Sequence, residues 1–149
     1  MAIIECELTI NSPPAEVYKA SQDYSVRYQW DPFPEKIELL GGATEISIGV
    51  KTLVIAKSGL KMEVQFVQVA PPTTAAIIMT QGPAFIHSFG GSWVFKPLSK
   101  NSTRAKFRYS IKTKPWAIPI ISEYIASLYF KKIVTARLIG LKTYCERLA

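Results

Sequence analysis

The feature of this sequence that most restricts its fold is a long C-terminal stretch that contains almost no helix-breaking residue. Between Ile118 and Leu148 the only glycine is Gly140, and the single proline, Pro119, stands near the start. Proline is compatible with the first turn of a helix, because the N–H that it lacks has no partner there. A helix over these residues is about 45 Å long, at about 1.5 Å per residue. That length exceeds the diameter of a domain of 149 residues, so the helix must lie along the rest of the molecule.

The two halves of this predicted helix present their apolar side chains on opposite faces. With about 100° of rotation per residue, the second half has one apolar stripe. The stripe consists of Phe130, Val134, Leu138, Leu141, Cys145 and Leu148. The apolar residues of the first half lie on the other side, and they are Ile121, Tyr124, Ile125 and Leu128. Either the helix kinks or changes its neighbour near Tyr129, or its first half faces a cavity mouth, a partner subunit or a membrane. In the second case Glu123 and Ser127 point inward and need polar partners.

Composition and charge exclude several classes of protein. The net charge of +7 favours anionic partners, but the lysines are scattered and no nucleic-acid-binding motif is present, so we expect no nucleic-acid partner. No apolar run approaches about 18 residues and the N-terminus does not resemble a signal peptide, so no membrane-spanning segment is expected. Cys6 and Cys145 have no metal-ligand spacing and His87 is the single histidine, so we expect free thiols and no metal site. These features predict a cytoplasmic protein, with peripheral attachment to a membrane as the alternative.

The residues before the long helix are organised as short elements joined by turn signals. Alternating apolar and polar residues predict strands over 4–10, 36–40, 50–57, 61–69, 74–80, 85–95 and 104–112. Two short helices are expected after the first strand, one after Ser12 and one from Asp23 to about Tyr28. The pair Gly90-Gly91 predicts a bulge or a sharp bend in the strand that contains it. The order indicates an α+β domain, in which a strongly bent antiparallel sheet of about seven strands wraps around the long helix.

Several short segments resemble a known superfamily in their order and spacing. They are residues 11–18, Trp30-Asp31-Pro32-Phe33, Ala70-Pro71-Pro72, residues 91–97, Ser102-Thr103-Arg104 and residues 140–146. Together they resemble the helix-grip domains of the START-like (SRPBCC) superfamily, which includes the polyketide cyclase/dehydrase and lipid-transport family. The resemblance implies a single domain over residues 1–149, with a deep apolar cavity between the sheet and the helix. It does not decide the activity, because the superfamily includes lipid and hormone carriers, quinone-binding proteins, aromatases and cyclases, and chaperone regulators.

The strand and helix patterns indicate which side chains would line such a cavity. The expected ligand-binding residues are Phe66, His87, Phe107, Tyr109, Glu123, Phe130, Val134 and Arg137. Three of these are candidates for chemistry: His87 as a hydrogen-bond donor or an acid–base group, Tyr109 as a phenol, and Arg137 as a partner of Glu123 or of a ligand oxygen. The plainer alternatives are a histidine at the rim, a tyrosine that packs in the core and an arginine on the surface. Trp30 and Phe33 either pack the short helices against the sheet or form an entrance to the cavity.

Three functions are compatible with these observations. The first is binding or transport of a hydrophobic small molecule, such as a lipid, an isoprenoid or quinone, or a polyketide-like compound. It is favoured because the sequence shows no nucleophile–base pair, paired carboxylates or phosphate-binding loop. The second is a polyketide cyclase, aromatase or dehydratase that works in the same cavity without a metal or cofactor. The third is a docking module that attaches to an anionic membrane or to a protein through the first half of the long helix. The ligand and the oligomeric state do not follow from the sequence.

Overall fold

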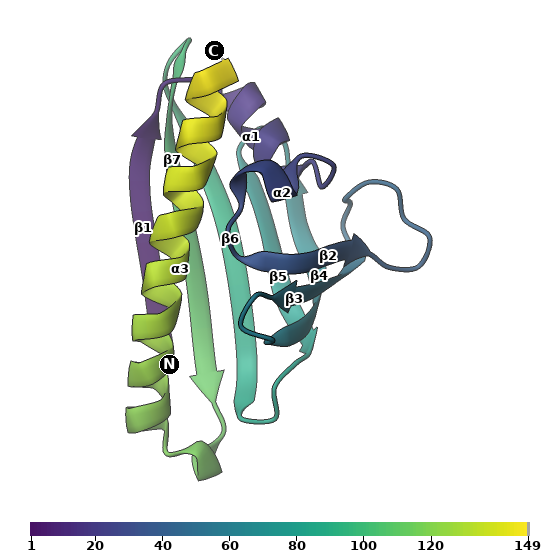
Figure 1. Cartoon of the computed structure of the whole chain (residues 1–149), viewed down its shortest axis with the longest axis vertical. Helices are drawn as coiled ribbons and strands as arrows, with labels where there is room; N and C mark the ends of the chain where they lie inside the picture. The colour runs from purple at the N-terminus through teal and green to yellow at the C-terminus, as the bar shows by residue number, and fades with distance from the viewer. Residues whose placement is uncertain (149) are drawn as a thin grey trace.

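The computed structural model describes residues 1–148 and shows one antiparallel sheet with a long helix beside it (Figure 1). The elements are β1 (Ala2–Ile10), α1 (Pro14–Gln22), α2 (Arg27–Trp30), β2 (Pro34–Leu39), β3 (Lys51–Ala56), β4 (Lys61–Ala70), β5 (Thr74–Gln81), β6 (Ile86–Ser99), β7 (Ser102–Thr113), the 3₁₀ turn η1 (Pro115–Ala117) and α3 (Pro119–Leu148). The seven strands are hydrogen-bonded in the order β1-β7-β6-β5-β4-β3-β2. This arrangement confirms the predicted α+β helix-grip fold, including the two short helices after the first strand.

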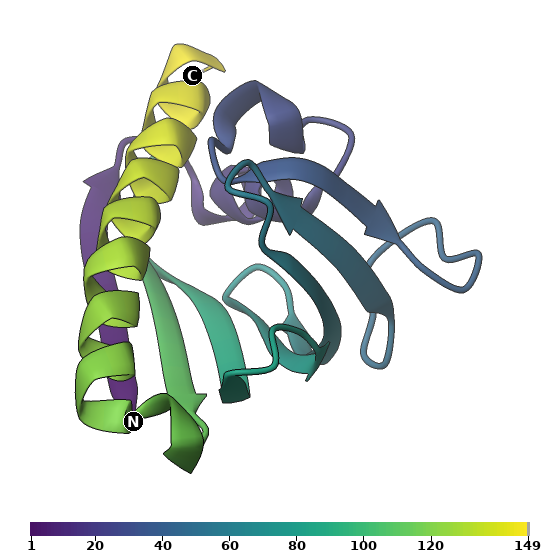
Figure 2. The same cartoon turned by 60° about the horizontal axis from the view of Figure 1, so that its bottom comes forward.

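The sheet curls, and its concave face is turned towards α3 (Figure 2). The helix packs against β1 and β7, while α1 and α2 lie near its C-terminal half. In β7 the alternation predicted from the sequence is present, because Phe107 and Tyr109 are buried whereas Arg104 and Arg108 are exposed. Successive side chains of a strand point to opposite faces. One strand therefore supplies both an aromatic inner wall and a basic outer surface.

The long helix α3 runs without interruption from Pro119 to Leu148, through Tyr129, and it is a single unbroken ribbon in Figure 1. Its second half buries the predicted stripe except for Leu148, which lies in the last turn and is 68% exposed. The apolar residues of its first half are exposed, so the change of face predicted from the sequence is present in the structure. Glu123 points towards the sheet, where its Oε2 accepts hydrogen bonds from the amide and the hydroxyl of Thr113 at 3.1 and 3.2 Å.

The second short helix is shorter than the sequence predicts. It begins at Arg27 rather than at Asp23. The Oδ1 atom of Asp23 accepts hydrogen bonds from the amide and the hydroxyl of Ser25, at 3.0 and 2.6 Å. Aspartate side chains often compete with helix formation by bonding the nearby backbone in this way. The residues from Asp23 onward therefore form a turn that leads into a helix of four residues.

The bulge predicted at Gly90-Gly91 is misplaced. The register between β6 and β7 shifts between Ile86 and Ser88, and it is regular through both glycines. Gly91 stands opposite Tyr109, and a Cβ atom at Gly91 would lie 3.0 Å from the ring of that tyrosine. The glycine therefore makes room for the tyrosine ring on the inner face of the sheet.

A second glycine allows two helices to meet closely. At Gly140 of α3, a Cβ atom would lie 2.2 Å from the carbonyl oxygen of Trp30, the last residue of α2. Real Cβ atoms are not found at such a distance, so only glycine allows this approach. The contact holds the end of α2 against α3 at the position of Gly140. It thereby places Asp31, the next residue, beside the helix turn that carries Arg137.

Candidate functional site

An apolar cavity lies between the inner face of the sheet and α3. Its wall is mainly apolar, and the aromatic residues that line it are Tyr24, Phe33, Phe66, Phe89, Trp93, Phe107, Tyr109 and Phe130. The rings are packed edge to face, with centroids 4.7 Å apart for Phe107 and Tyr109 and 5.2 Å apart for Tyr109 and Phe130. The remaining volume is about 80 Å³, whereas small-molecule sites usually have about 300 to 1,000 Å³. A larger ligand therefore requires some of these side chains to move apart.

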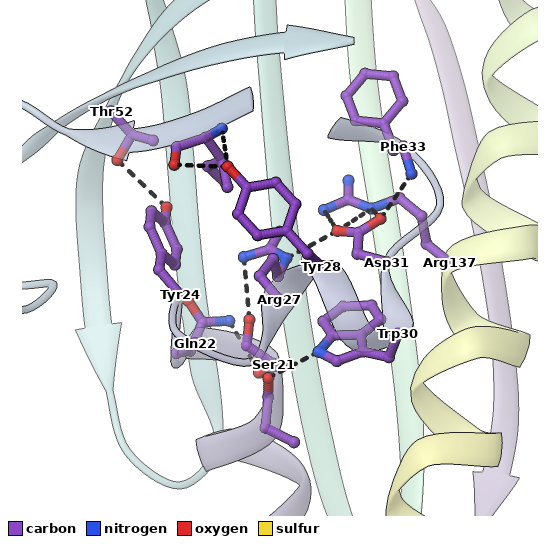
Figure 3. Close-up of polar contacts among 12 residues, drawn as sticks. Ser21, Gln22, Tyr24, Arg27, Tyr28, Trp30, Asp31, Phe33, Thr52 and Arg137 are labelled. Atoms are coloured by element: carbon purple, nitrogen blue, oxygen red, sulfur yellow. Dashed lines mark hydrogen bonds and ion pairs between the residues drawn. The ribbon is translucent and has the colours of Figure 1, made fainter. Parts of the chain in front are cut away.

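Two arginines line this mainly apolar cavity, and one buried carboxylate lies between them (Figure 3). The Nε and Nη2 atoms of Arg137 donate to Asp31, with Nε 3.1 Å from Oδ1 and Nη2 2.9 Å from Oδ2. The Nε atom of Arg27 donates to the same Oδ2 atom at 2.8 Å. All three residues are at most 6% exposed. The cluster joins α2, the following connection and α3 in one hydrogen-bonded unit.

Local structure explains how the chain brings this cluster together. Arg27 and Asp31 are four residues apart, which is the spacing that brings two side chains to one face of a helical turn. The amide of Phe33 donates to Oδ1 of Asp31 at 3.0 Å, so the backbone after α2 fixes the carboxylate from the other side. Gly140 lies three residues after Arg137, and its contact with the end of α2 sets the distance between the two charged groups.

Tyr109 extends this cluster to the sheet. The Nη1 atom of Arg137 donates a hydrogen bond to the phenol oxygen of Tyr109. The guanidinium carbon of Arg137 also lies 4.7 Å from the ring centre of Phe107 and 5.3 Å from that of Phe33. Such cation–π contacts are favourable where water is excluded. Arg137 is therefore held by a carboxylate, a phenol and aromatic faces at once.

The charges of the cluster do not cancel. Burial acts to raise the pKa of Asp31, but Arg137 and Arg27 outweigh it and hold the pKa below its usual range, so Asp31 is ionised at neutral pH. Burial raises the pKa of Tyr109, so its phenol is neutral. Guanidinium groups remain protonated in proteins. Two positive charges thus share one negative charge, and the cavity wall carries an excess of one positive charge.

Arg27 is the arginine with unused donors. Its Nη1 atom donates to the carbonyl of Ser21 at 3.1 Å, and its Nε atom donates to Asp31. Within residues 1–148, no hydrogen bond from Nη2 of Arg27 is present. Its guanidinium lies over the rings of Tyr24 and Trp30, at 5.4 and 5.3 Å from their centres. A ligand oxygen in the cavity would find a charged donor here.

The structure separates the residues that the sequence suggested for a single site. Phe33, Phe66, Phe107, Tyr109, Phe130 and Arg137 line the cavity. Val134 is buried in the core beside them without lining it. Trp30 packs the short helices against the sheet, because its Nε1 atom donates to the carbonyl of Ala20 at 3.0 Å and its ring meets Trp93 at 6.0 Å.

His87 and Glu123 do not belong to this cavity. Both line a separate surface groove, formed near the start of β1, the end of β7 and the start of α3. His87 is exposed because the register shift between Ile86 and Ser88 turns it out of phase with the buried Phe89. The expected pairing of Arg137 with Glu123 is also wrong, since Arg137 pairs with Asp31 and Glu123 is bound to Thr113.

Two residues of the cluster are absent from the site expected from the sequence. One sequence feature of Arg27 and Asp31 could have predicted that they form an ion pair, namely the spacing of four residues between opposite charges. Their role depends on the contact of α2 with α3, which no local pattern reveals. No group of three or more histidine, cysteine, aspartate or glutamate side chains that could hold a metal ion occurs within residues 1–148.

Comparison with known proteins identifies relatives of this fold. The model of the family described as polyketide cyclase/dehydrase and lipid transport matches residues 1–146. No curated protein sequence matches the chain.

Three solved structures with the same fold illustrate how widely it occurs. The protein TTHA0849 from Thermus thermophilus shares 16% identity over 99% of each chain, with a TM-score of 0.79. A START superfamily protein from Mycobacterium smegmatis shares 13% identity over 100% of each chain, with a TM-score of 0.69. Norcoclaurine synthase from Thalictrum flavum, in complex with dopamine and hydroxybenzaldehyde, shares 14% identity over 95% of this chain and 84% of that one, with a TM-score of 0.70. At these identities the likeness shows the fold alone.

Proposed function

The chain belongs to the polyketide cyclase/dehydrase and lipid transport family, and from this membership we propose that it binds an apolar small molecule with an anionic head group. The head group lies beside Arg27, Arg137 and Tyr109, and the apolar part lies among the aromatic rings of the cavity. Lipids, isoprenoids or quinones, and polyketide-like compounds that carry a carboxylate or an acidic phenol or enol fit this description.

The observation that carries this proposal is the uncompensated positive charge in the cavity wall. A buried charge without a partner is unfavourable, and here two guanidinium groups share the single carboxylate of Asp31. An anionic oxygen from a ligand would balance the excess charge. It would also accept hydrogen bonds from charged donors, which are roughly twice as strong as neutral ones.

The aromatic lining supports an apolar body for the ligand. Aromatic and aliphatic side chains stabilise a ligand mainly by removing its apolar surface from water, at about 25 cal/mol per Å². Because the cavity has only about 80 Å³, binding requires the lining to open. Three wall residues stand outside the regular strands and helices: Tyr24 between α1 and α2, Phe33 between α2 and β2, and Leu60 between β3 and β4.

A second candidate, catalysis on a carbonyl compound, is favoured by one feature of the same cluster. The guanidinium of Arg137 and the phenol of Tyr109 are adjacent and would stabilise a developing enolate oxygen. The structure of norcoclaurine synthase with dopamine and hydroxybenzaldehyde illustrates that a related fold accommodates aromatic compounds. A cyclase also needs a base, and the one carboxylate in this cluster, Asp31, has a lowered pKa and is held by two arginines. Binding is therefore the function that we place first.

The proposal is tested by comparing two ligands that differ only in the head group. Isothermal titration calorimetry would measure the dissociation constants of dodecanoate and 1-dodecanol below their aggregation concentrations. We expect the carboxylate to bind at least about tenfold more tightly, which corresponds to about 1.4 kcal/mol. Failure of both ligands to bind would overturn the hydrophobic site, and equal affinities would overturn only the anionic head group.

A charge-removing variant makes the test specific. Arg27→Met removes the excess charge but leaves the pairing of Arg137 with Asp31 in place. We expect the preference for dodecanoate to fall to within about threefold, since one charge-assisted hydrogen bond is worth about 1.5 to 3 kcal/mol. Arg104→Met is the matched control, because Arg104 is exposed on the outer face of β7 and should leave the preference unchanged.

Native mass spectrometry of the freshly purified protein addresses the natural ligand. A bound mass that is lost on denaturation and that extracts into organic solvent as an acid would support the proposal. A bound mass that extracts as a neutral compound would contradict the proposed head group.

A further inference from the structure

One end of the molecule exposes a group of large apolar side chains. The seven residues of this group, which we call the apolar tip, are Trp116, Ile118, Ile120, Ile121, Tyr124, Ile125 and Leu128. Their exposed fractions range from 56% to 89%. They belong to η1, to the residue that joins it to α3, and to the first turns of α3. Proteins in water rarely expose a cluster of this size, and such clusters usually mark a surface for binding.

The apolar tip stands at one extremity of the molecule. In Figure 1 η1 and the start of α3 lie at the lower end of the long axis, whereas the C-terminal end of α3 and α1 lie at the opposite end. The apolar tip can therefore enter a soft apolar layer without burying the remaining surface of the protein. No helix among residues 1–148 is long and apolar enough to cross a membrane.

Lysines flank the apolar tip on both sides in the sequence. Residues 112–132 contain four lysines, Lys112, Lys114, Lys131 and Lys132, and none of them forms an ion pair with another residue of 1–148. The one acidic residue in this segment, Glu123, is 13% exposed and is bound by Thr113 and by the ammonium group of Met1. Residues 112–132 therefore carry an excess of exposed positive charge, with no exposed carboxylate of this segment to neutralise it.

We propose that the apolar tip inserts into the surface of a membrane that contains anionic phospholipids. Isoleucine and leucine side chains would lie at the boundary of the acyl chains, about 5 to 10 Å deep. Trp116 and Tyr124 have an apolar ring and a polar atom, which suits the level of the head groups. The four lysines would face the negative lipid phosphates and carboxylates. This proposal rests on the exposed surface of η1, Ile118 and α3, and it does not depend on what the cavity binds.

The charge pattern favours a membrane over a second copy of the chain. Two copies that met along the first half of α3 would bring Lys131 and Lys132 close to lysines of the partner. The same segment offers only Glu123 as an acidic partner, and its carboxylate is already engaged. Like charges without counterions oppose such a contact, whereas an anionic lipid surface satisfies the apolar face and the lysines together.

Vesicle flotation tests the proposal directly. The full chain would be mixed with vesicles of phosphatidylcholine alone or with about 30 mol% phosphatidylserine, at low salt and at about 0.1 M salt. We expect flotation with the anionic vesicles, weakened by salt, and little flotation with phosphatidylcholine alone. If the protein fails to float with the anionic vesicles at both salt concentrations, the proposal is overturned.

Two pairs of matched variants separate the apolar and the charged contributions. The triple variant Ile120→Ser, Ile121→Ser, Ile125→Ser should lose flotation. The control variant Ile48→Ser with Leu98→Ser should still float, although Ile48 and Leu98 are 68% and 55% exposed.

The double variant Lys131→Gln with Lys132→Gln tests the charged contribution. It should weaken binding about 25-fold at low salt, at about fivefold per lysine. Lys96→Gln with Lys100→Gln changes the net charge equally and should change binding less than about threefold. Equal effects of a variant pair and its control would contradict a localised docking surface.

Trp116 reports the depth of insertion. Lipids with brominated acyl chains should quench part of the tryptophan fluorescence of the wild-type protein, and Trp116→Phe should remove the quenched part, because Trp30 and Trp93 are buried. A concentration-dependent dimer that the triple serine variant abolishes, together with no quenching, would show that a second copy covers the apolar tip and would overturn the proposal.

Discussion

Arg137 of α3 and Asp31 at the end of α2 form a two-point ion pair between positions that are 106 residues apart in the chain. The pair is buried, and Arg27 shares the same carboxylate. It links the long helix to the short one and also brings two guanidinium groups to the cavity wall. The stability of the fold and the charge of the candidate binding site therefore depend on one carboxylate.

Replacing this carboxylate with a neutral amide should destabilise the protein strongly. In Asp31→Asn two guanidinium groups would remain in an apolar layer without a counter-charge, and removal of one partner from a buried ion pair typically costs about 3 to 5 kcal/mol. Urea unfolding would measure the change in the free energy of unfolding. Asp23→Asn is the matched control, because within residues 1–148 the Asp23 carboxylate accepts hydrogen bonds only from Ser25, and the substitution should change stability by less than about 1 kcal/mol. Equal effects of both substitutions would show that the buried cluster contributes little.

The same carboxylate should make the stability depend on pH in the acid range. The pKa of Asp31 in the folded protein is lowered, because Arg137 and Arg27 more than offset the effect of burial. A lowered folded-state pKa means that the stabilisation is complete above the unfolded value, about 3.9, and is lost as the pH falls below it. Urea unfolding between pH 3 and pH 7 should show a steeper loss below about pH 4 in the wild type than in Asp31→Asn.

Other carboxyl groups do not obscure this comparison. The pKa of Glu146 is also lowered, by the amide of Asn11 and by Lys142, but it contributes equally to both proteins. Parallel curves for the wild type and Asp31→Asn would therefore mean that Asp31 does not release its proton more readily in the folded state.

The parts of the fold that the sequence predicts are those with a periodic signal. The alternation of Phe107 and Tyr109 with charged residues marks β7, and the long stretch without breakers marks α3. The start of α2 is not predictable in this way, because the side chain of Asp23 competes with the helix backbone. Gly91 wrongly suggests a bulge, because the reason for a glycine there is the ring of Tyr109 on another strand, which a local sequence pattern does not show.

The candidate site is less accessible from sequence than the fold. The helical stripe allows Arg137 to reach the cavity but leaves a surface position equally open, and it does not identify the partner of Arg137. Asp31 is far away in the chain, and it reaches Arg137 only through the close contact at Gly140. His87 is excluded from the cavity by one residue of register shift, which a periodic pattern does not reveal.

Gly140→Ala should destabilise the protein although alanine favours helix. Alanine is about 1 kcal/mol better than glycine within a helix, but its Cβ would lie 2.2 Å from the carbonyl oxygen of Trp30. Because backbone must move to relieve this clash, we expect a net loss of about 1 to 3 kcal/mol in urea unfolding. Ala136→Gly at an exposed position of α3 measures the helix-propensity contribution alone. A more stable Gly140→Ala protein would show that α2 does not press against α3.

A hydrogen bond between the β3–β4 turn and α3 should control how fast a ligand leaves. The hydroxyls of Ser58, in the turn between β3 and β4, and Tyr129, on α3, are 2.7 Å apart, and their chain neighbourhoods carry the lining residues Leu60 and Phe130. Because the cavity must open to admit a ligand, breaking this bond should ease the opening.

Tyr129→Phe should therefore release dodecanoate faster while the folded structure is retained. A bond of this kind is worth about 0.5 to 1.5 kcal/mol, so stopped-flow displacement should show a dissociation rate increased about twofold to tenfold. Ser58→Ala should give the same increase, and the double variant should add nothing, because both substitutions remove one bond. Tyr124→Phe is the control, since Tyr124 lies on the same helix and its hydroxyl forms no hydrogen bond within residues 1–148. An unchanged rate in Tyr129→Phe would mean that the ligand leaves elsewhere than between the β3–β4 turn and α3.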